Sequence, residues 1–508
     1  MAANYLHGIE TTEVERGPRA IKVVKSAVVA VVGSAPTGPV NTLTLSQTEV
    51  DDAQFGPDLP GFGIPEALAG IHAFGAGTVL VINVLDPAVH KSAVTAQERT
   101  FGLNDLVQLG HGALQTLTLK SADGSKTYVS GTDYEATLLT GRVKRLAGGQ
   151  IPAQSVVKAD YTYADPSKIT AAEIIGSVNI AGQRSGMKLF ADSYNLFGFF
   201  PKILLAPGFS TLNAVSTELA ALADVLGAIA YVDAPIGVSP SQAVSGRGPL
   251  GTINFNTSSE RVRLHYPHVK IYDSLTDGER LQPLSIRSAG LRAKVDNDEG
   301  YWTSHSNHEL VGVIGLERSL TARVDDPNSE VNLLNENGIT TVFNSFGTGL
   351  RLWGNRTAAW PTVTHMKNFE NVRRTKDVVD ESIRYSMLQF VDKNVTNALI
   401  ESVVESVNQF IRKLFGDGAL LGGECWYDPA RNPQTQLEQG HVLFSYKLTV
   451  PPPFERGTFE TEITGEYLAN LGGTQYWPDL AHIGSPTRPS TWTETPSSDG
   501  RPKSTWAQ

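Results

Sequence analysis

Two apolar runs on either side of a helical segment constrain the fold of this chain most. The run at 26–32 is almost entirely apolar and ends at Gly33, which is typical of a strand buried on both faces. The segment 65–74 has a helical pattern, with Pro65 in its first turn and glycines after it. A second apolar run follows at 78–85. Strand, helix and strand in this order predict an α/β layer with parallel pairing.

The same alternation returns later in the chain. A strand is predicted at 203–206, an amphipathic helix at 212–226 and the next strand at 228–233. Between the two blocks, short alternating segments separated by Gly- and Asp-containing turns fill 91–165. This pattern predicts a small antiparallel β-sandwich inserted into the α/β domain. It shows no concentrated aromatic platform or carboxylate cluster, so surface decoration is favoured over carbohydrate or receptor binding.

The N-terminal residues 1–25 do not resemble the start of a compact domain. Polar and apolar side chains alternate there, and Gly17 and Pro18 break the run. The pattern predicts a strand-forming arm with a hinge, and it fits either an edge strand of its own domain or an arm that leaves the subunit. The arm side chains that we expect to matter are Ile9, Thr11, Val14, Ile21 and Val23.

The C-terminal region begins with the strongest helical signal of the chain. Apolar residues recur at steps of three and four over 376–415, which predicts two helices or one interrupted helix. Two strands are predicted after it, at 441–450 and 458–467. Beyond Leu471 the chain is rich in Pro, Ser and Thr but holds three of the seven tryptophans. Two interpretations fit this tail: it docks in an assembly, or it stays disordered.

Composition narrows the functional classes. The chain has 508 residues, enough for two to four domains, and 41% hydrophobic with 19% charged residues describe a globular protein. A net charge of -10 argues against a nucleic-acid partner. The single cysteine, Cys425, excludes an intramolecular disulfide and a multi-thiolate metal site, and it fits synthesis in a reducing compartment. We expect no signal peptide and no membrane insertion, because no apolar run has the required length.

Several residue groups imitate catalytic or metal sites but lack an essential component. The GxGxxG pattern at 246–251 follows a Ser-containing segment instead of a strand, and Pro249 lies inside it. The other groups lack a third ligand, a bidentate glutamate or a neighbouring base. They are His265 with His268, His305 with His308, Asp296 with Asp298 and Glu299, and Cys425. We therefore predict no catalytic, cofactor-binding or metal-binding residues, and no enzyme.

The stretch 338–357 joins a strand-like run to the turn Trp-Gly-Asn-Arg-Thr. This stretch resembles the signature of contractile-tail sheath proteins, which occur in bacteriophages and contractile injection systems. The signature positions follow in family order as Leu334, Asn335, Gly338, Ile339, Gly347, Gly349, Trp353, Gly354, Arg356 and Thr357. Further pieces, among them VVGSAPTGPVN, PKILLAPGFS and HYPHVKIYD, resemble other blocks of the family along nearly the whole chain. One departure is Ala73 before Phe74, where many relatives carry two aromatics.

The resemblance implies a multidomain α+β/α/β fold. An α/β sheath core carries the inserted antiparallel β-sandwich on its outer surface, and strand-donating arms extend from both ends. The predicted domains are an N-terminal arm at 1–25, a first core segment at 26–90, the inserted domain at 91–185, a second core segment at 186–345, a C-terminal sheath domain at 346–470 and a C-terminal extension at 471–508.

The resemblance also implies the function. Sheath proteins assemble as stacked six-subunit rings around an inner tail tube, and contract at a signal from the baseplate to drive the tube through the host envelope, without a nucleotide. The implied partners are further copies of the chain, the tail tube protein, and the baseplate and tail terminator proteins. The implied location is the virion tail, assembled in the bacterial cytoplasm. A non-viral contractile injection device and a static virion tube or shell protein stay open as alternatives, with a hydrolytic virion enzyme more distant.

Candidate site residues follow from this resemblance. On the C-terminal strand we expect inter-subunit contacts from Phe459, Thr461, Ile463 and Tyr467, although an ordinary edge strand fits the same pattern. The signature residues Trp353, Gly354, Arg356 and Thr357 are expected to fix the fold of the C-terminal domain. The basic group Arg373, Arg374 and Lys376 fits two interpretations, contact with an acidic tube and a solvated helix start.

Overall fold

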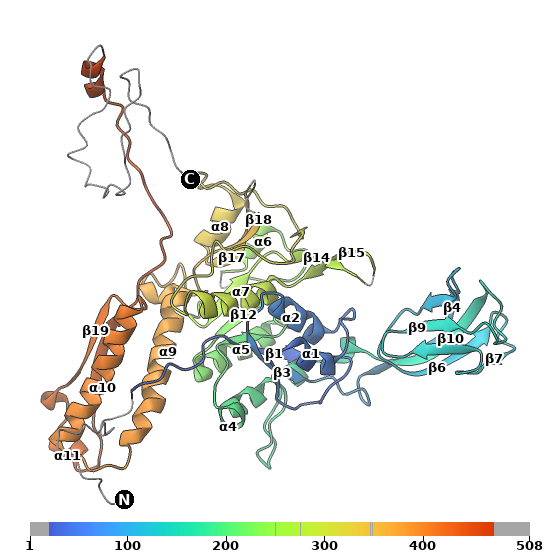
Figure 1. Ribbon diagram of the computed structural model, residues 1–508, viewed down its shortest axis with the longest axis horizontal. Coiled ribbons are helices and arrows are strands. Elements are labelled where there is room, and N and C mark those ends of the chain that lie inside the picture. The colour runs from blue at the N-terminus through green and yellow to red at the C-terminus, as the bar shows by residue number, and fades with distance from the viewer. Residues whose placement is uncertain (1–19, 249, 275, 346, 348, 472–508) are drawn as a thin grey trace, which may run out of the picture. The chain divides into compact units, whose positions relative to one another are not determined.

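The computed structural model describes residues 20–471, except 249, 275, 346 and 348 (Figure 1). The chain divides into a large unit that ends at Pro453 and a second unit that starts at Phe454. The large unit contains an α/β core, an inserted β domain and a C-terminal helical unit, which we define below by their elements. No helix in the described residues is long and apolar enough to cross a membrane.

The core is an eight-stranded sheet with the strand order β18-β17-β13-β12-β11-β1-β3-β2. Its inner strands, from β17 to β3, pair in parallel, and the edge strands β18 and β2 pair antiparallel. The parallel layer expected from the apolar runs is thus confirmed, within a mixed sheet. The strands are β1 Val28–Gly33, β2 Thr44–Ser46, β3 Thr78–Asn83, β11 Ile203–Leu205, β12 Ile229–Asp233, β13 Val262–His265, β17 Ile339–Ser345 and β18 Gly349–Trp353.

Helices cover both faces of this sheet (Figure 1). Residues of α5 (Asn213–Leu226) pack on one face, and residues of α2 (Gly63–His72) and α7 (Leu284–Asp298) pack on the other. Because successive strand residues point to opposite faces, a sheet covered twice needs strands that are apolar throughout. Helices α2 and α7 approach closely at Gly290, where a Cβ atom would lie 2.9 Å from the Cα atom of Ile71.

Smaller elements surround the core. The strands β14 Val269–Asp273, β15 Gly278–Gln282 and β16 Gly315–Leu316 form a three-stranded antiparallel sheet. Short helices are α1 Glu49–Asp52, α3 Ala171–Ile175, α4 Ser193–Phe197, α6 Pro240–Ser245, α8 Glu330–Glu336 and α11 Gln434–Leu437. The domain boundary predicted between 345 and 346 falls inside the antiparallel β17–β18 hairpin, so β18 belongs to the large core sheet.

The inserted domain consists of two antiparallel sheets, ordered β4-β10-β6-β7 and β5-β9-β8, that share one hydrophobic cluster. The antiparallel character predicted for this segment is confirmed. Its ends are held together, since Asp165 N donates to His90 O at 2.9 Å and the His90 ring contacts Glu173 Oε1 at 2.8 Å. The strands are β4 Lys91–Thr100, β5 Leu106–Gln108, β6 Leu114–Ser121, β7 Thr127–Tyr128, β8 Tyr134–Thr137, β9 Arg142–Arg145 and β10 Val156–Ala164.

The C-terminal helical unit contains α9 (Glu370–Ser386), α10 (Asn397–Gly416) and a hairpin of β19 (Gly422–Tyr427) and β20 (Phe444–Thr449). The helical signal is therefore two helices, and β20 lies within the strand predicted at 441–450. The strand predicted at 458–467 is wrong for the folded chain, which has no regular structure at 454–464 and a 3-10 helix at Glu466–Asn470. A strand requires a partner for its backbone hydrogen bonds, and no strand among the described residues pairs with this segment.

We expect the inserted domain to fold without the rest of the chain, because its two sheets enclose their own hydrophobic cluster. A fragment of residues 86–175 should unfold in one cooperative transition, followed by circular dichroism in urea. Leu119 is fully buried in this cluster, so Leu119→Ala should lower the free energy of unfolding by about 2–5 kcal/mol. A substitution at exposed Leu103 serves as the control. A gradual transition would show that the segment depends on the core.

Candidate functional site

Helix α9 buries a charged face against the α/β core. Glu370, Arg374, Asp377 and Glu381 follow one another at three- and four-residue steps, which places them on one side of the helix. All four are buried, with exposed fractions of 2%, 3%, 8% and 5%. Charged side chains are buried in proteins only when they are paired. We call this contact between α9 and the core the α9 seam.

Each charge of the α9 seam has a buried partner of opposite sign in the core. The ion pairs are Glu370 with Arg263, Arg374 with Asp296, Asp377 with Arg261 and Glu381 with Lys202. Asp296 also pairs with Arg292 of α7 at 2.5 Å. The seam therefore connects α9 to strand β13, to the residues before β11 and β13, and to α7. Removal of one partner from a buried pair leaves an unpaired charge, which costs about 3–5 kcal/mol.

Arg263 is the centre of the seam. Its guanidinium donates to Thr340 Oγ1 at 2.8 Å and to the carbonyl of Gly354 at 2.5 Å. Burial lowers the pKa of Arg263 to about 10, and burial with the neighbouring guanidinium groups holds the pKa of His305 well below its ordinary value. His305 is consequently neutral, and the charge of Arg263 is balanced by Glu370. Tyr231 donates its hydroxyl to the same carboxylate at 2.5 Å.

The turn at 353–357 makes contacts inside its own chain. The ring of Trp353 stacks on Phe343 at 4.6 Å, and the Arg356 guanidinium lies 4.1 Å from the Trp360 ring centre. Thr357 is fully buried and donates its hydroxyl to a backbone carbonyl at 3.0 Å. Gly354 has a φ of 136°, and a Cβ atom there would lie 3.1 Å from the Thr340 backbone. Glycine is required at this position, next to the carbonyl that Arg263 binds.

The three basic residues at the start of α9 do not share one surface. Arg374 lies in the α9 seam, so the structure corrects both interpretations of it as an exposed side chain, tube contact and solvated helix start. Arg373 is half-buried and binds Glu260 at 2.8 Å. Lys376 is exposed and pairs with Asp380, one turn further along the helix.

Residues 20–27, which we call the strap, lead into β1 and run along α9. Lys22 N donates to Ser386 Oγ at 3.3 Å and Val24 N to Ser382 Oγ at 3.1 Å. Ile21 is buried in the hydrophobic cluster of the C-terminal helical unit, whereas Val23 is 39% exposed. The other predicted arm residues, Ile9, Thr11 and Val14, lie outside the described residues.

The opposite end of α9 contacts the root of the C-terminal segment. Asn371 donates its side-chain amide to the carbonyl of Pro451 at 3.4 Å and to that of Trp302 at 2.9 Å. In the unit that follows, the predicted contact residues are exposed, with Phe459 at 94%, Ile463 at 98% and Tyr467 at 63%. Thr461 is exposed as well. Both roots of the terminal segments are thus hydrogen-bonded to α9, one near each end of the helix.

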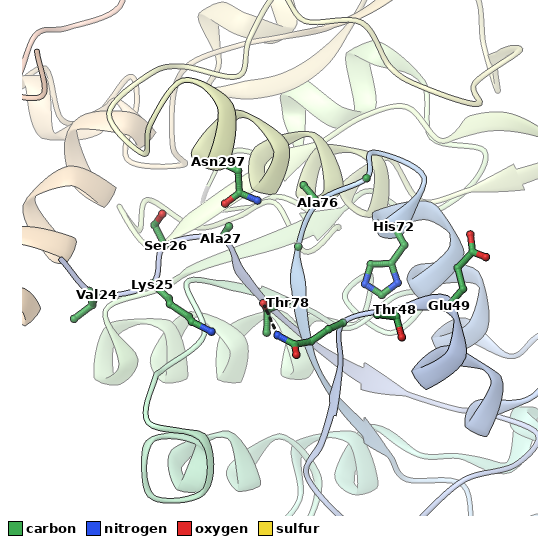
Figure 2. Close-up of a pocket in the computed structure, with 13 residues that line it drawn as sticks. Val24, Lys25, Ser26, Ala27, Thr48, Glu49, His72, Ala76, Thr78 and Asn297 are labelled. Atoms are coloured by element: carbon green, nitrogen blue, oxygen red, sulfur yellow. Dashed lines mark hydrogen bonds between the residues drawn. The ribbon is translucent and has the colours of Figure 1, made fainter. Parts of the chain in front are cut away.

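A pocket of about 590 Å³ lies beside the strap (Figure 2). Val24–Ala27 of the strap line one side of it, and His72, Thr48 and Asn297 line other sides. The polar groups here serve the fold: His72 Nδ1 contacts Asp52 at 2.7 Å, and Thr48 caps helix α1. The described residues contain no group of three or more His, Cys, Asp or Glu that could hold a metal ion.

The residue groups that imitate catalytic sites have structural roles. In the GxGxxG pattern, Arg247 donates to the carbonyls of Asn337 at 2.8 Å, Phe255 at 2.9 Å and Ala358 at 2.6 Å, and so connects three segments. Asp296 belongs to the α9 seam. His265 is buried, and burial lowers its pKa well below the ordinary value. Cys425 is buried, and burial raises the pKa of its thiol, which opposes nucleophilic reactivity.

Sequence reasoning missed the α9 seam. Charges at helical spacing usually mark a solvated face, and the sequence offers no sign that this face is buried. One signal was available in the core. Arg261 and Arg263 alternate with apolar residues as the chain enters β13, a strand otherwise buried. Two arginines in a central strand require carboxylate partners from another element.

Comparison with known proteins gives a consistent result. The family model for the phage tail sheath protein central domain matches residues 182–358, and that for the phage tail sheath C-terminal domain matches 362–464. A family of unknown function, UCP028589, matches 87–174. The tail sheath protein of Burkholderia phage BcepMu is 62% identical over 475 residues, covering 93% of this chain and 100% of the relative.

Two solved structures share the fold. The anti-feeding prophage helical sheath in its contracted state is similar with a TM-score of 0.56 at 16% identity, covering 91% of this chain and 100% of the other. A chain of the anti-feeding prophage baseplate, 6-fold symmetrised, is similar with a TM-score of 0.54 at 16% identity and the same coverage.

We expect the α9 seam to stabilise the subunit through paired charges. Glu381→Leu should lower the free energy of unfolding by about 3–5 kcal/mol, because it leaves Lys202 buried without its partner. Lys202→Met combined with Glu381→Leu should recover most of this loss. Urea unfolding of the three variants measures the effect. The exposed pair Arg412 and Glu405 is the control, where Arg412→Met should cost at most about 1 kcal/mol. Equal losses in the single and double variants would contradict the charge-pair account.

Proposed function

The chain belongs to the phage tail sheath protein family and is a contractile tail sheath subunit of a myovirus-like phage, and from this premise we propose that it polymerises as stacked six-subunit rings around an inner tail tube. The family is structural and non-enzymatic, in keeping with the structural roles of the buried polar groups described above. The six-fold symmetry of the related baseplate structure supports the ring. The 62% identical relative from a phage supports a phage tail over a non-viral injection device.

The exposed C-terminal segment carries this proposal. Phe459 and Ile463 are 94% and 98% exposed on a stretch that has no regular structure and no partner strand in the described chain. Large apolar side chains exposed together mark an interaction surface. The β19–β20 hairpin packs on α10, and neither of its two strands pairs with a further strand of the described chain. Its edges therefore present backbone groups to which another strand can add. We propose that terminal segments of neighbouring subunits add to this hairpin by strand pairing.

In this arrangement, mechanical force from the neighbouring subunits reaches α9 through both arms. The strap is hydrogen-bonded to α9 near the C-terminal end of the helix. The root of the C-terminal segment is hydrogen-bonded to α9 near the N-terminal end of the helix. The ion pairs of the α9 seam then transmit this force to the α/β core. Contraction releases the free-energy difference between two packings of the subunits and requires no nucleotide. The contracted state of the related helical sheath supports this motion. The partners that we propose are the tail tube, baseplate and tail terminator proteins.

A contractile sheath differs from a static tube protein in one measurable property. Both would use terminal arms, but only a sheath changes its length. Electron microscopy of the tubes before and after a contraction stimulus distinguishes them. A single striation spacing under all conditions would favour the static tube.

Truncation of the terminal segments tests the role of the arms. Removal of residues 1–25 would also remove buried Ile21 and two hydrogen bonds to α9, so the better variants lack residues 1–19 or end at Pro453. With co-expressed tube protein, the full chain should give striated tubes in negative-stain electron microscopy. Each truncated chain should remain monomeric and keep the melting temperature of the full chain. Tubes from both truncated chains would contradict the arm proposal, and no tubes from the full chain would contradict the sheath assembly.

A further inference from the structure

The segment 176–186 forms an ordered finger between α3 and the 3-10 helix Gly186–Asp192. Its two sides are hydrogen-bonded, with Ser185 N donating to Ser177 O at 3.0 Å and Asn179 N to Gln183 O at 2.9 Å. The turn at the tip is closed by Gly182 N, which donates to Asn179 O at 2.9 Å. The Asn179 side chain adds two hydrogen bonds across to Gln183, both at 2.8 Å. The finger is therefore a folded projection and not an open loop.

The stem of the finger is built so that it cannot take side chains. Gly176 and Gly186 have φ values of 73° and 54° and face each other. A Cβ atom on Gly176 would lie 1.8 Å from Ser185 O, and one on Gly186 would lie 2.5 Å from Glu173 O. Gly186 N also donates to Asn41 Oδ1 at 2.9 Å, which attaches the stem to the core. A stem this close-packed holds the tip in a fixed position.

The tip presents apolar side chains to solvent. Val178 is 55% exposed and Ile180 is 109% exposed, so Ile180 has essentially no neighbours in its own chain. Neither residue belongs to a hydrophobic cluster of the described residues. Single exposed aliphatics are common, but here two stand on a rigid, hydrogen-bonded projection. Since the tip is already ordered, its burial in a partner would cost little conformational entropy.

Charge narrows the choice of partner. The run 174–183 contains no charged residue, and Arg184 at its end is paired with Asp192 at 2.6 Å. Each copy of the chain carries a net charge of -10, so copies repel one another at long range. Contacts between copies are then favoured on uncharged surfaces. An uncharged apolar projection suits a second copy of this chain better than a strongly charged partner.

We propose that the finger 176–186 inserts Val178 and Ile180 into a depression on a second copy of this chain in the assembled sheath. The proposal rests on the proposed polymerisation. The finger meets a different surface on its neighbour, so the contact is head-to-tail. Such a contact does not close into a dimer. It can repeat from subunit to subunit, as a helical polymer requires. The finger would set the relative position of two subunits, while the arms hold them together.

Photo-crosslinking tests the contact directly. Benzoylphenylalanine is incorporated at position 180 of the full chain, and assembled sheaths are irradiated and digested for mass spectrometry. A crosslink from position 180 to one surface region of another sheath copy is expected. A crosslink to the tube protein, or none in sheaths that assemble normally, would overturn the finger proposal and leave the sheath assembly intact. Failure of the unmodified chain to assemble would overturn both.

A substitution gives the energetic test. Ile180→Asp should raise the protein concentration needed for assembly at least about tenfold, since it places a charge in an apolar contact. The control is Val225→Asp on α5, an aliphatic residue that is 78% exposed and lies outside the finger. Both variants should keep the melting temperature of the unmodified monomer, because neither side chain is buried. Equal effects of the two substitutions on assembly would overturn the special role of the finger.

Discussion

The buried ion pairs between α9 and the α/β core are the contact on which the other elements of the subunit depend. An apolar interface between a helix and a sheet tolerates small shifts in register, because dispersion and burial are not directional. A row of charges does not tolerate such shifts, since each carboxylate has to contact its own Lys or Arg partner. Arg263 additionally binds the carbonyl of Gly354, so the position of α9 and the path of the turn at 353–357 are set together. The seam thus fixes where the C-terminal helical unit starts.

This rigidity has a purpose in a polymer that changes its packing. The ladder hydrogen bonds that we propose between subunits are each worth about 0.5–1.5 kcal/mol net, so a short arm contributes a few kcal/mol and can reorient. The pairs inside the subunit are buried and cost several kcal/mol to break singly. The roots of both arms are hydrogen-bonded to α9, at Ser382 and Ser386 and at Asn371. A force on an arm therefore reaches α9, whose buried ion pairs cost more to break than the hydrogen bonds between subunits.

The sequence predicted the core better than the seam, for a physical reason. The continuous apolar runs that became β1 and β3 have one stable solution, burial on both faces of a parallel sheet. The charged face of α9 has two stable solutions, because the same spacing of charges suits exposure to solvent or burial against a matching set of charges. The partners are also distant in the sequence, as Lys202 is from Glu381. For the segment 458–467 the sequence predicted a regular element that the folded chain lacks. Its alternation indicated a strand, but the strand needs a partner that the described chain does not contain.

The arms and the finger would divide the work of assembly. Strand pairing binds strongly through the backbone but is permissive in register, because backbone groups repeat along the chain. A rigid knob such as Ile180 contributes less binding energy but is specific in position, since it fits only where a depression of its shape lies. A lattice held by arms alone could slip between neighbouring registers. A lattice with a positional contact has defined states, and a contractile sheath needs defined extended and contracted states to convert their difference into motion.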